Sequence, residues 1–384
     1  MHPETSEISD EAHGGHKGSD SNGRDELLGT LGERSILTNI LIPRLAGSNA
    51  GSQAIGDDCA ELLSPDPGYA FLATTDPCPT PVVFDLEDRD YWHYGRMTIL
   101  INVSDLAAMG AVPQGILIST VMPNEMRVAD YQRYLDGLIE AAAEWGCPIV
   151  GGNIKDGPEF TSTGTAFGTA PVTNIMRRTG ARVGDVVCVA GRMGLFWAAV
   201  LQRLSHRDLR ISPQSSADLK EALYRPIARL KEGLILADSG LVTACMDSSD
   251  GVGACLVELA DKNCVDVTLD VDGLIPEQSV REVADELAID PRKLLLAWGN
   301  WELVFTVAPD NLDALVDLAV SHDLPIAQIG RLSEGEGHVW LTEGLRRRPV
   351  NNFASERFTS LSYFTHGLKS YMQWLIEAPL TSEE

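Results

Sequence analysis

The chain has 384 residues, a formal net charge of −25 and a hydrophobic content of 44%. This length allows a large buried core and predicts two domains. The acidic excess argues against a nucleic-acid partner or an anionic membrane surface, because both require a basic face. It leaves phosphorylated ligands possible, because metal ions bridge carboxylates to phosphates.

Cysteine usage and the absence of targeting segments predict a cytoplasmic protein. The seven cysteines include no Cys-x-x-Cys pair, and most of them lie in apolar runs. We therefore expect buried, unpaired thiols in a reducing compartment. We find no signal peptide and no apolar run long enough to span a bilayer.

The first domain is predicted over residues 26–176, after a polar tail over residues 1–25 whose composition predicts disorder. Helical spacing of apolar residues over 27–45 predicts its first helix. Strands and helices then alternate, with strands predicted over 69–73, 115–122 and 161–172 and a helix over 130–145.

The stretch Ile99–Pro113 is expected to organise this domain. Ile99, Leu100, Ile101 and Val103 form a β-branched-rich apolar run, which predicts a buried strand. Residues 106–109 have helical propensity. We therefore expect Asp105 at a junction between a strand and a helix, where an anion also suits the helix start.

The second domain is predicted over residues 177–345, with 346–384 as a C-terminal extension. Strands are expected over 186–189 and 241–246, a helix over 228–237, and a final strand that ends near Leu341. Because strands alternate with helices in both halves, the sequence favours two α/β or α+β domains.

Six aspartates share one local setting on turns rich in Gly, Ser and Thr, and four of them are expected to follow an apolar strand directly. They are Asp57, Asp58, Asp76, Asp105, Asp247 and Asp250. Strand ends in such folds meet at one crevice, where the carboxylates would repel one another unless cations neutralise them. Oxygen ligands on turns suit Mg²⁺, so we predict a metal-dependent nucleotide site. Taken singly, each aspartate is equally explained as a helix cap or a turn former.

With these residues in place, the chain resembles the thiamine-monophosphate kinases of the aminoimidazole ribonucleotide synthetase-like (PurM-like) superfamily. The matching pieces come in the family's order: Gly56-Asp57-Asp58, Thr74-Thr75-Asp76, Asn102 to Ala111, Gly151-Gly152, Arg178-Thr179-Gly180-Ala181 and Asp247-Ser248-Ser249-Asp250-Gly251. The ordered set covers residues 30 to 340 approximately, and the block from Asn102 to Ala111 is its most specific piece.

The resemblance implies an N-terminal α+β domain whose sheet pairs with that of a second subunit, a C-terminal α/β domain, and ATP with Mg²⁺ between them. It implies that the six aspartates hold Mg²⁺ and that Thr75, Gly152, Asn153, Arg178 and Ser249 contact the nucleotide. The chemistry would be in-line phosphoryl transfer, with Asp105, Asp247 and Arg178 at its centre.

Two segments depart from the family pattern. Asn153 replaces the aspartate of a Gly-Gly-Asp motif, so this position carries an amide oxygen without charge. The family's Gly-Gly-Glu-Asp-Tyr-Glu-Leu run is Ala297-Trp-Gly-Asn-Trp-Glu-Leu303 here, which makes Trp298, Asn300, Trp301 and Glu302 the candidate acceptor-side residues. The two tryptophans could stack on a planar ring or pack in the core.

The leading hypothesis is therefore an ATP- and Mg²⁺-dependent kinase for a small molecule that need not be thiamine phosphate. The first alternative is ATP-driven activation of an amide or carboxyl oxygen, followed by ring closure or amine attack. The second alternative is a nucleotide-binding protein without turnover that serves as a partner of other proteins.

Overall fold

The computed structural model describes residues 35, 38–39, 57–62, 64–205, 208–351, 353 and 362–382. The predicted tail over residues 1–25 lies outside the described residues, and so does the predicted helix over 27–45 apart from three positions. In the described part of the chain, no helix has both the length and the apolar character needed to cross a bilayer.

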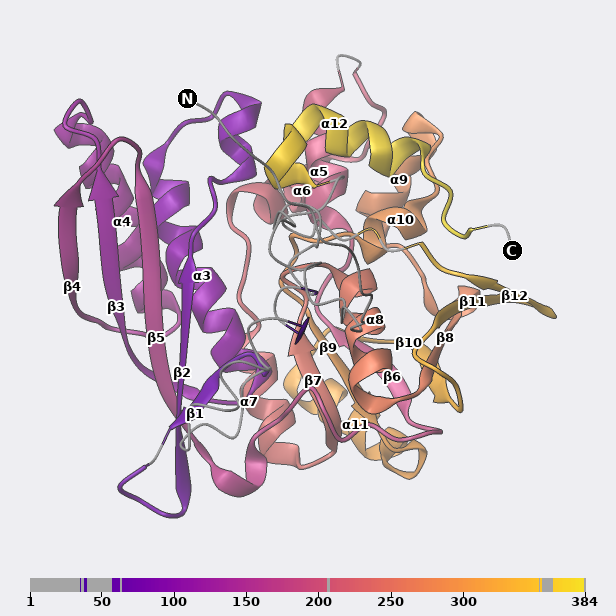
Figure 1. Cartoon of the computed structure of the whole chain (residues 1–384). Helices are drawn as coiled ribbons and strands as arrows, with labels where there is room; N and C mark the ends of the chain where they lie inside the picture. Colours follow the sequence, from indigo (N-terminus) through magenta and orange to yellow (C-terminus); the bar gives the residue numbers. More distant parts are fainter. Residues whose placement is uncertain are drawn as a thin grey trace, which may run out of the picture.

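The first half of the chain builds a five-stranded sheet with two helices on one face (Figure 1). The strand order is β1 (Ala60–Leu62), β2 (Tyr69–Pro77), β5 (Thr161–Pro171), β3 (Val112–Met122) and β4 (Ile149–Asp156). Strands β3 and β4 are parallel, joined by α4 (Val128–Glu144), and the other neighbours are antiparallel. The predicted strands over 69–73, 115–122 and 161–172 and the helix over 130–145 are confirmed.

The predicted strand over residues 99–103 is wrong, because these residues lie inside helix α3 (Tyr91–Ala108). The side chain of Asp90 caps this helix by accepting a hydrogen bond from the backbone N of Trp92 at 3.0 Å. Helix α3 is buried on nearly every side, between the sheet, α4 and α7 (Leu230–Ser239). A helix without a polar face shows no helical periodicity in its sequence, so its β-branched run resembled a strand. Asp105 consequently lies in the last turn of a helix.

The second half builds a seven-stranded sheet that is antiparallel except for the pair β11–β8. The strand order is β12 (Arg346–Pro349), β11 (Val339–Glu343), β8 (Asp266–Asp270), β10 (Ile326–Ser333), β6 (Val186–Ala190), β9 (Leu303–Val307) and β7 (Val242–Asp247). This confirms the predicted strands over 186–189 and 241–246, and α7 confirms the predicted helix over 228–237. The mixed two-sheet architecture agrees with the predicted fold class.

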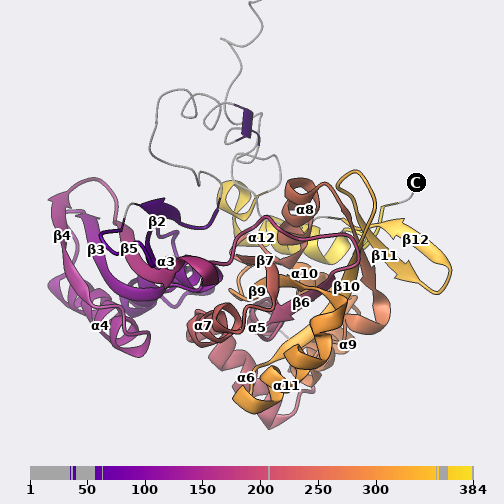
Figure 2. The same ribbon diagram turned by 90° about the horizontal axis from the view of Figure 1, so that it is seen from below.

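Helices cover both faces of the second sheet (Figure 2). One core holds side chains of α5 (Leu195–Leu204), α6 (Pro213–Tyr224), α8 (Val252–Asn263), α9 (Gln278–Leu287), α10 (Pro291–Leu296) and α12 (Tyr363–Glu377). The other face packs against α7, α11 (Leu312–His322) and α3. Short 3₁₀ turns complete the chain: η3 (Val82–Leu86), η4 (Val172–Asn174), η5 (Val271–Gly273) and η6 (Pro309–Asn311).

The core that contains α3 is shared by both halves of the chain. It joins Leu106 and Ile99 of α3 to Phe305 of β9 and Cys245 of β7, all of them fully buried. Because α3 contacts both β2 and β7, its last turn is held next to the end of β7. This packing determines where the candidate functional site lies.

Candidate metal and nucleotide site

Three carboxylates meet where α3, β7 and the segment before β1 come together. One oxygen from each of Asp58, Asp105 and Asp247 lies within 4.8 Å of the others, and all three side chains are buried. Asp58 comes two residues before β1, Asp105 is in the last turn of α3, and Asp247 is the last residue of β7. We call these residues the carboxylate trio.

Hydroxyl groups fix the orientation of two members of the trio. The Thr74 Oγ1 donates to Asp105 Oδ2 at 2.5 Å, and the Ser104 Oγ donates to Asp247 Oδ2 at 2.6 Å. The Ser249 Oγ donates to Asp247 Oδ1 at 3.0 Å. Hydrogen bonds to an ionised carboxylate are among the stronger ones in proteins, so these oxygens have defined positions before any ligand arrives.

The trio is electrostatically unfavourable by itself. Burial, followed by the charges of Asp247 and Asp76, raises the pKa of Asp105 well above its usual value. Burial and the charge of Asp58 raise the pKa of Asp247 to about 7, against the stabilising hydrogen bond from Ser104. Buried carboxylates that face one another require a cation, and a set of hard oxygen donors suits Mg²⁺. The residues therefore fit the predicted metal.

A single guanidinium joins the trio to helix α8. Arg178 donates from Nε and Nη2 to the two oxygens of Asp58, at 3.0 and 2.8 Å, and from Nη1 to Glu258 Oε1 at 2.8 Å. Burial is the largest single influence and by itself would lower the pKa of Arg178, but the charges of Asp58, Glu258 and Asp247 and the hydrogen bonds to Asp58 together raise this pKa well above its usual value. Arg178 is therefore a permanent positive charge at the edge of the trio.

The remaining predicted aspartates surround the trio. Asp57 accepts a hydrogen bond from the backbone N of Arg178 at 2.9 Å, and it pairs with Arg177 at 3.5 Å. Asp76 lies on the same face of β2 as Thr74, as residues two apart on a strand do, and its charge acts on Asp105. Asp250 is exposed on the turn that follows β7.

Thr75 points to the opposite face of β2, where its Oγ1 donates to the carbonyl of Gly164 at 3.0 Å. This geometry leaves Thr74, its neighbour, as the hydroxyl that reaches the trio. The sequence already showed both threonines in one motif, but strand alternation decides between them only once the register is known.

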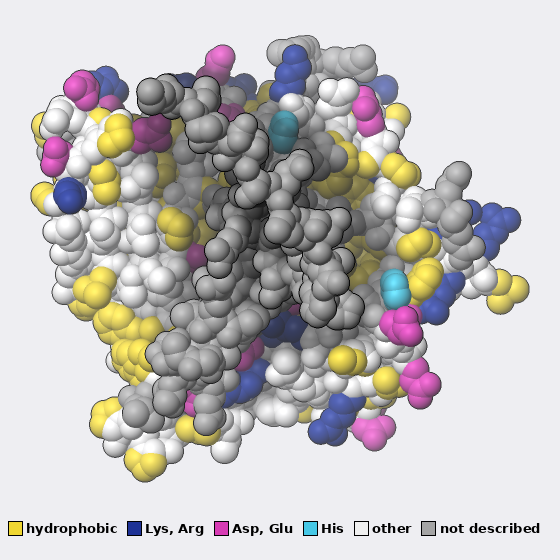
Figure 3. All heavy atoms as spheres, in the orientation of Figure 1, with side chains coloured by type: hydrophobic (Ala, Val, Ile, Leu, Met, Phe, Trp, Pro, Cys, Tyr) yellow, Lys and Arg dark blue, Asp and Glu magenta, His cyan; other side chains and the backbone are white. Residues whose placement is uncertain are grey.

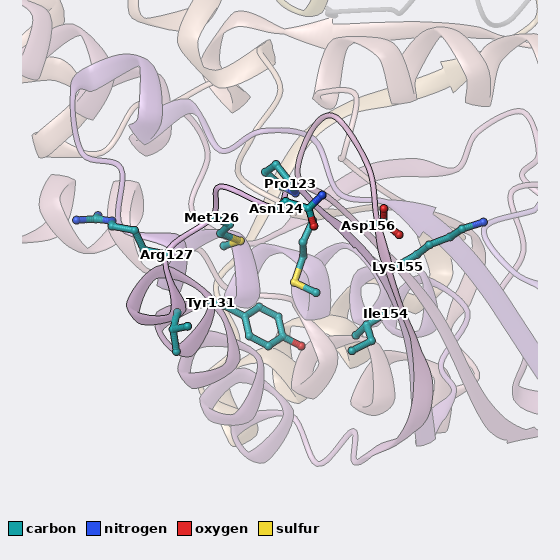
Figure 4. A pocket seen from close by; sticks show the side chains of 10 residues that line it. Pro123, Asn124, Met126, Arg127, Tyr131, Ile154, Lys155 and Asp156 are labelled. Carbon is teal, nitrogen blue, oxygen red and sulfur yellow. The ribbon is translucent and has the colours of Figure 1, made fainter.

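Gly152 and Asn153 are not brought next to the trio within one chain. They lie on the exposed edge strand β4, which β5 and β3 separate from β2. A cavity of about 470 Å³ opens at the end of this strand, and Tyr131 of α4 and Ile154 face it from two sides (Figure 4).

The predicted acceptor-side residues are buried. The Trp298 ring lies 5.2 Å from that of Trp197 and 5.3 Å from that of Tyr363, in the core arrangement that the sequence left open. Trp301 is also buried, and Asn300 Oδ1 accepts a hydrogen bond from the backbone N of Phe196 at 2.9 Å. Their contact with an acceptor stays a prediction.

Glu302 connects the segment 297–303 to the carboxylate trio. It is fully buried, and its Oε2 accepts from Ser248 Oγ at 2.5 Å, while the backbone N of Ser248 donates to its carbonyl at 2.8 Å. Burial raises the pKa of Glu302 to about 7. Glu302 thereby holds the turn that directly follows Asp247.

The described residues that contact this site and were missed from the sequence include Thr74, Ser104 and Glu258. Thr74 and Ser104 are each part of a motif that pointed to the site, so attention to hydroxyls beside aspartates would have found them. Glu258 gave no signal, because it is one of many charged residues on a helix and only the tertiary structure brings it to Arg178.

Comparisons with known proteins show the family to which the chain belongs. The family model for the N-terminal domain of AIR synthase related proteins matches residues 56–170, and the model for their C-terminal domain matches residues 182–341. A thiamine-monophosphate kinase of Pyrococcus horikoshii is 32% identical over 258 residues, which cover 67% of this chain and 77% of the relative.

Solved structures show the same relationship. A structure of AaThiL complexed with AMPPCP and TMP has a TM-score of 0.69 and 27% identity, and the match covers 81% of this chain and 93% of that chain. The thiamine-monophosphate kinase from Stenotrophomonas maltophilia has a TM-score of 0.63 and 32% identity, with coverage of 78% and 94%. The chain therefore belongs to the AIR synthase related family, and within it to the thiamine-monophosphate kinase relatives.

Proposed function

We propose that this protein is an ATP- and Mg²⁺-dependent kinase that transfers a phosphoryl group to a small molecule. The observation that carries the proposal is the buried carboxylate trio beside Arg178, which combines a cation site with a phosphate-binding group. Family membership supports the same chemistry, because the relatives are named thiamine-monophosphate kinases and one of them is complexed with AMPPCP and TMP.

Each residue of the site has a role that follows from its contacts. Asp58, Asp105 and Asp247 would hold Mg²⁺, with Asp57, Asp76 and Asp250 as further ligands around them. Bound Mg²⁺ would neutralise the phosphate charge that resists transfer. Thr74, Ser104 and Ser249 keep the carboxylate oxygens in place, and Arg178 offers a planar fork for phosphate oxygens. Positioning of this kind accounts for most of the catalysis in phosphoryl transfer.

The acceptor is a small molecule that need not be thiamine monophosphate. In the segment 297–303 two acidic positions of the family are Gly299 and Asn300, and Trp298 is packed under α12. We propose that these changes alter the acceptor pocket and leave the nucleotide site intact. None of the seven cysteines, all of which lie in the described part of the chain, forms a disulfide bond, and this suits a cytoplasmic location.

We further propose that the protein works as a homodimer joined through the outer face of the first sheet. This face exposes Tyr69, Val112 and Leu117, and a stacked pair of Phe71 and Phe167 lies on it. Away from the upper rim, the surface over this sheet is nearly free of charge, although the chain carries a net charge of −25 (Figure 3). A partly apolar face with so little charge, on such an acidic protein, favours burial against a second copy.

The test is ATP consumption in the presence of Mg²⁺, with thiamine monophosphate and a panel of heteroaromatic alcohols, phosphates and amides as acceptors. We expect ADP and a phosphorylated product with one acceptor class, and a loss of at least about a hundredfold in Asp105→Asn and Asp247→Asn. Asp310→Asn, on η6, is the matched control and keeps full activity. Free phosphate with a dehydrated product would instead support the cyclase or ligase chemistry.

A further inference from the structure

Arg178 is held by two carboxylates that grip different edges of its guanidinium. Asp58 accepts from Nε and Nη2, and Glu258 accepts from Nη1. Asp58 lies before β1, whereas Glu258 projects from α8, so the two partners belong to separate elements. The side chain of Asp58 is 1% exposed, and those of Arg178 and Glu258 are each 23% exposed.

Asp58 has two roles that compete with each other. Both of its oxygens accept hydrogen bonds from Arg178, and it is also one of the three carboxylates placed to hold a cation. A dication on Asp58 and the guanidinium of Arg178 would repel each other across a few ångströms. Cation binding therefore weakens the ion pair between Asp58 and Arg178. A largely buried arginine that has no anionic partner is strongly unfavourable.

Glu258 lies outside the carboxylate trio, so a cation held by the trio leaves it available to Arg178. Glu258 also pairs with Lys262, one turn further along α8, at the longer distance of 3.7 Å. We propose that Glu258 is a positioning residue, which keeps Arg178 at the site when Asp58 binds the cation. The Nε and Nη2 edge of Arg178 then turns from Asp58 to a phosphate of the nucleotide.

This inference rests on the proposed function, and its test measures binding instead of turnover. Isothermal titration calorimetry gives the dissociation constant of Mn²⁺ alone and of the Mg²⁺ complex of a β,γ-methylene ATP analogue. The full-length variants are Glu258→Gln, Arg178→Met and the double variant. Asp261→Asn is the control, because it removes an equal charge from the same helix without contacting Arg178.

We expect Glu258→Gln to raise both dissociation constants about tenfold, and Asp261→Asn to change them less than twofold. In the Arg178→Met background, Glu258→Gln should have no further effect, because Glu258 acts through that arginine. If Arg178→Met does not fold, Arg178→Lys replaces it, since an ammonium cannot bridge both carboxylates.

Two results would overturn the inference. One is that Glu258→Gln leaves both dissociation constants unchanged and only lowers the unfolding temperature. This result would mean that Glu258 has a purely structural role. The other is that Glu258→Gln weakens binding equally in the wild type and in the Arg178→Met background, which would indicate a long-range effect of the lost charge. A wild-type protein that binds neither Mn²⁺ nor the nucleotide complex would overturn the proposed function itself, and is therefore distinguishable from both.

Discussion

At the scale of single residues, the site is built from groups that would be more stable apart. Asp105 and Asp247 are buried beside each other and beside Asp58, and their pKa values are raised as a result. The repulsion among these carboxylates favours cation binding, because a bound cation is attracted by several carboxylates that already have fixed positions.

The destabilisation that an ionised Asp247 causes depends on pH, so its sign can be tested. The pKa of Asp247 in the folded protein is about 7, above its ordinary value of 3.8. The folded state therefore binds this proton more tightly, and the stabilisation is complete below about pH 4 and is lost as the pH rises through 7. In chelator at pH 8, we expect the free energy of unfolding of Asp247→Asn to exceed that of the wild type by up to about 4 kcal/mol, which corresponds to a pKa raised from 3.8 to about 7.

Thermal or urea unfolding at pH 5 and pH 8 measures the difference in the free energy of unfolding between Asp247→Asn and the wild type. This difference should be smaller at pH 5 and in excess Mg²⁺. A variant that is less stable than the wild type at pH 8 in chelator would show that the buried charge is already compensated within the chain.

At the scale of elements, α12 closes the second core and connects it to the first half of the chain. The hydroxyl of Tyr363 donates to Asp85 of η3 at 2.9 Å, and Tyr363 and Phe364 pack on Trp298. Trp298 thereby belongs to an aromatic cluster that also contains Trp197 and Tyr371. Large rings in such a cluster contribute mainly to stability.

Replacing Trp298 distinguishes packing from acceptor binding. We expect Trp298→Ala to lower the free energy of unfolding by roughly 3–5 kcal/mol, because it leaves a large cavity. The affinity for the ATP analogue should stay within about twofold in the protein that remains folded. Urea unfolding and calorimetry measure the two quantities. A large rise in the KM of the acceptor without loss of stability would place the ring in the acceptor pocket.

At the scale of the whole molecule, α3 and α4 cover one face of the first sheet, and no described helix covers its other face (Figure 1). This open face is partly apolar and carries little charge away from its upper rim (Figure 3), and the edge strand β4 with Gly152 and Asn153 borders it. The second sheet has helices on both faces, so among the described residues only the first sheet leaves a broad β surface for a second copy.

We expect the wild type to be a dimer in solution and Leu117→Glu to be a monomer. Leu117 is 43% exposed on the open face, and a charge there cannot be buried against a second copy without a partner. Val320→Glu is the control, because Val320 is 78% exposed on α11, and it should remain a dimer. Light scattering after gel filtration measures the mass, and a monomeric wild type would contradict the proposed interface.

The sequence by itself determined the fold class, most strands, and three aspartates that the structure brings together. Asp58, Asp105 and Asp247 stood out because each lies in a short motif of small polar residues, which is a local signal. The error at residues 99–103 has a physical reason, since α3 is buried on nearly every side and therefore carries no amphipathic pattern.

Only the tertiary structure decided which groups meet. Thr74 rather than Thr75 reaches Asp105 because strand register selects the face, and Glu258 reaches Arg178 because α8 packs beside the segment that follows the first domain. Likewise, Trp298 is enclosed by α12, which comes more than sixty residues later in the chain. Such contacts join residues far apart in sequence, so they depend on packing and register and leave no local pattern to read.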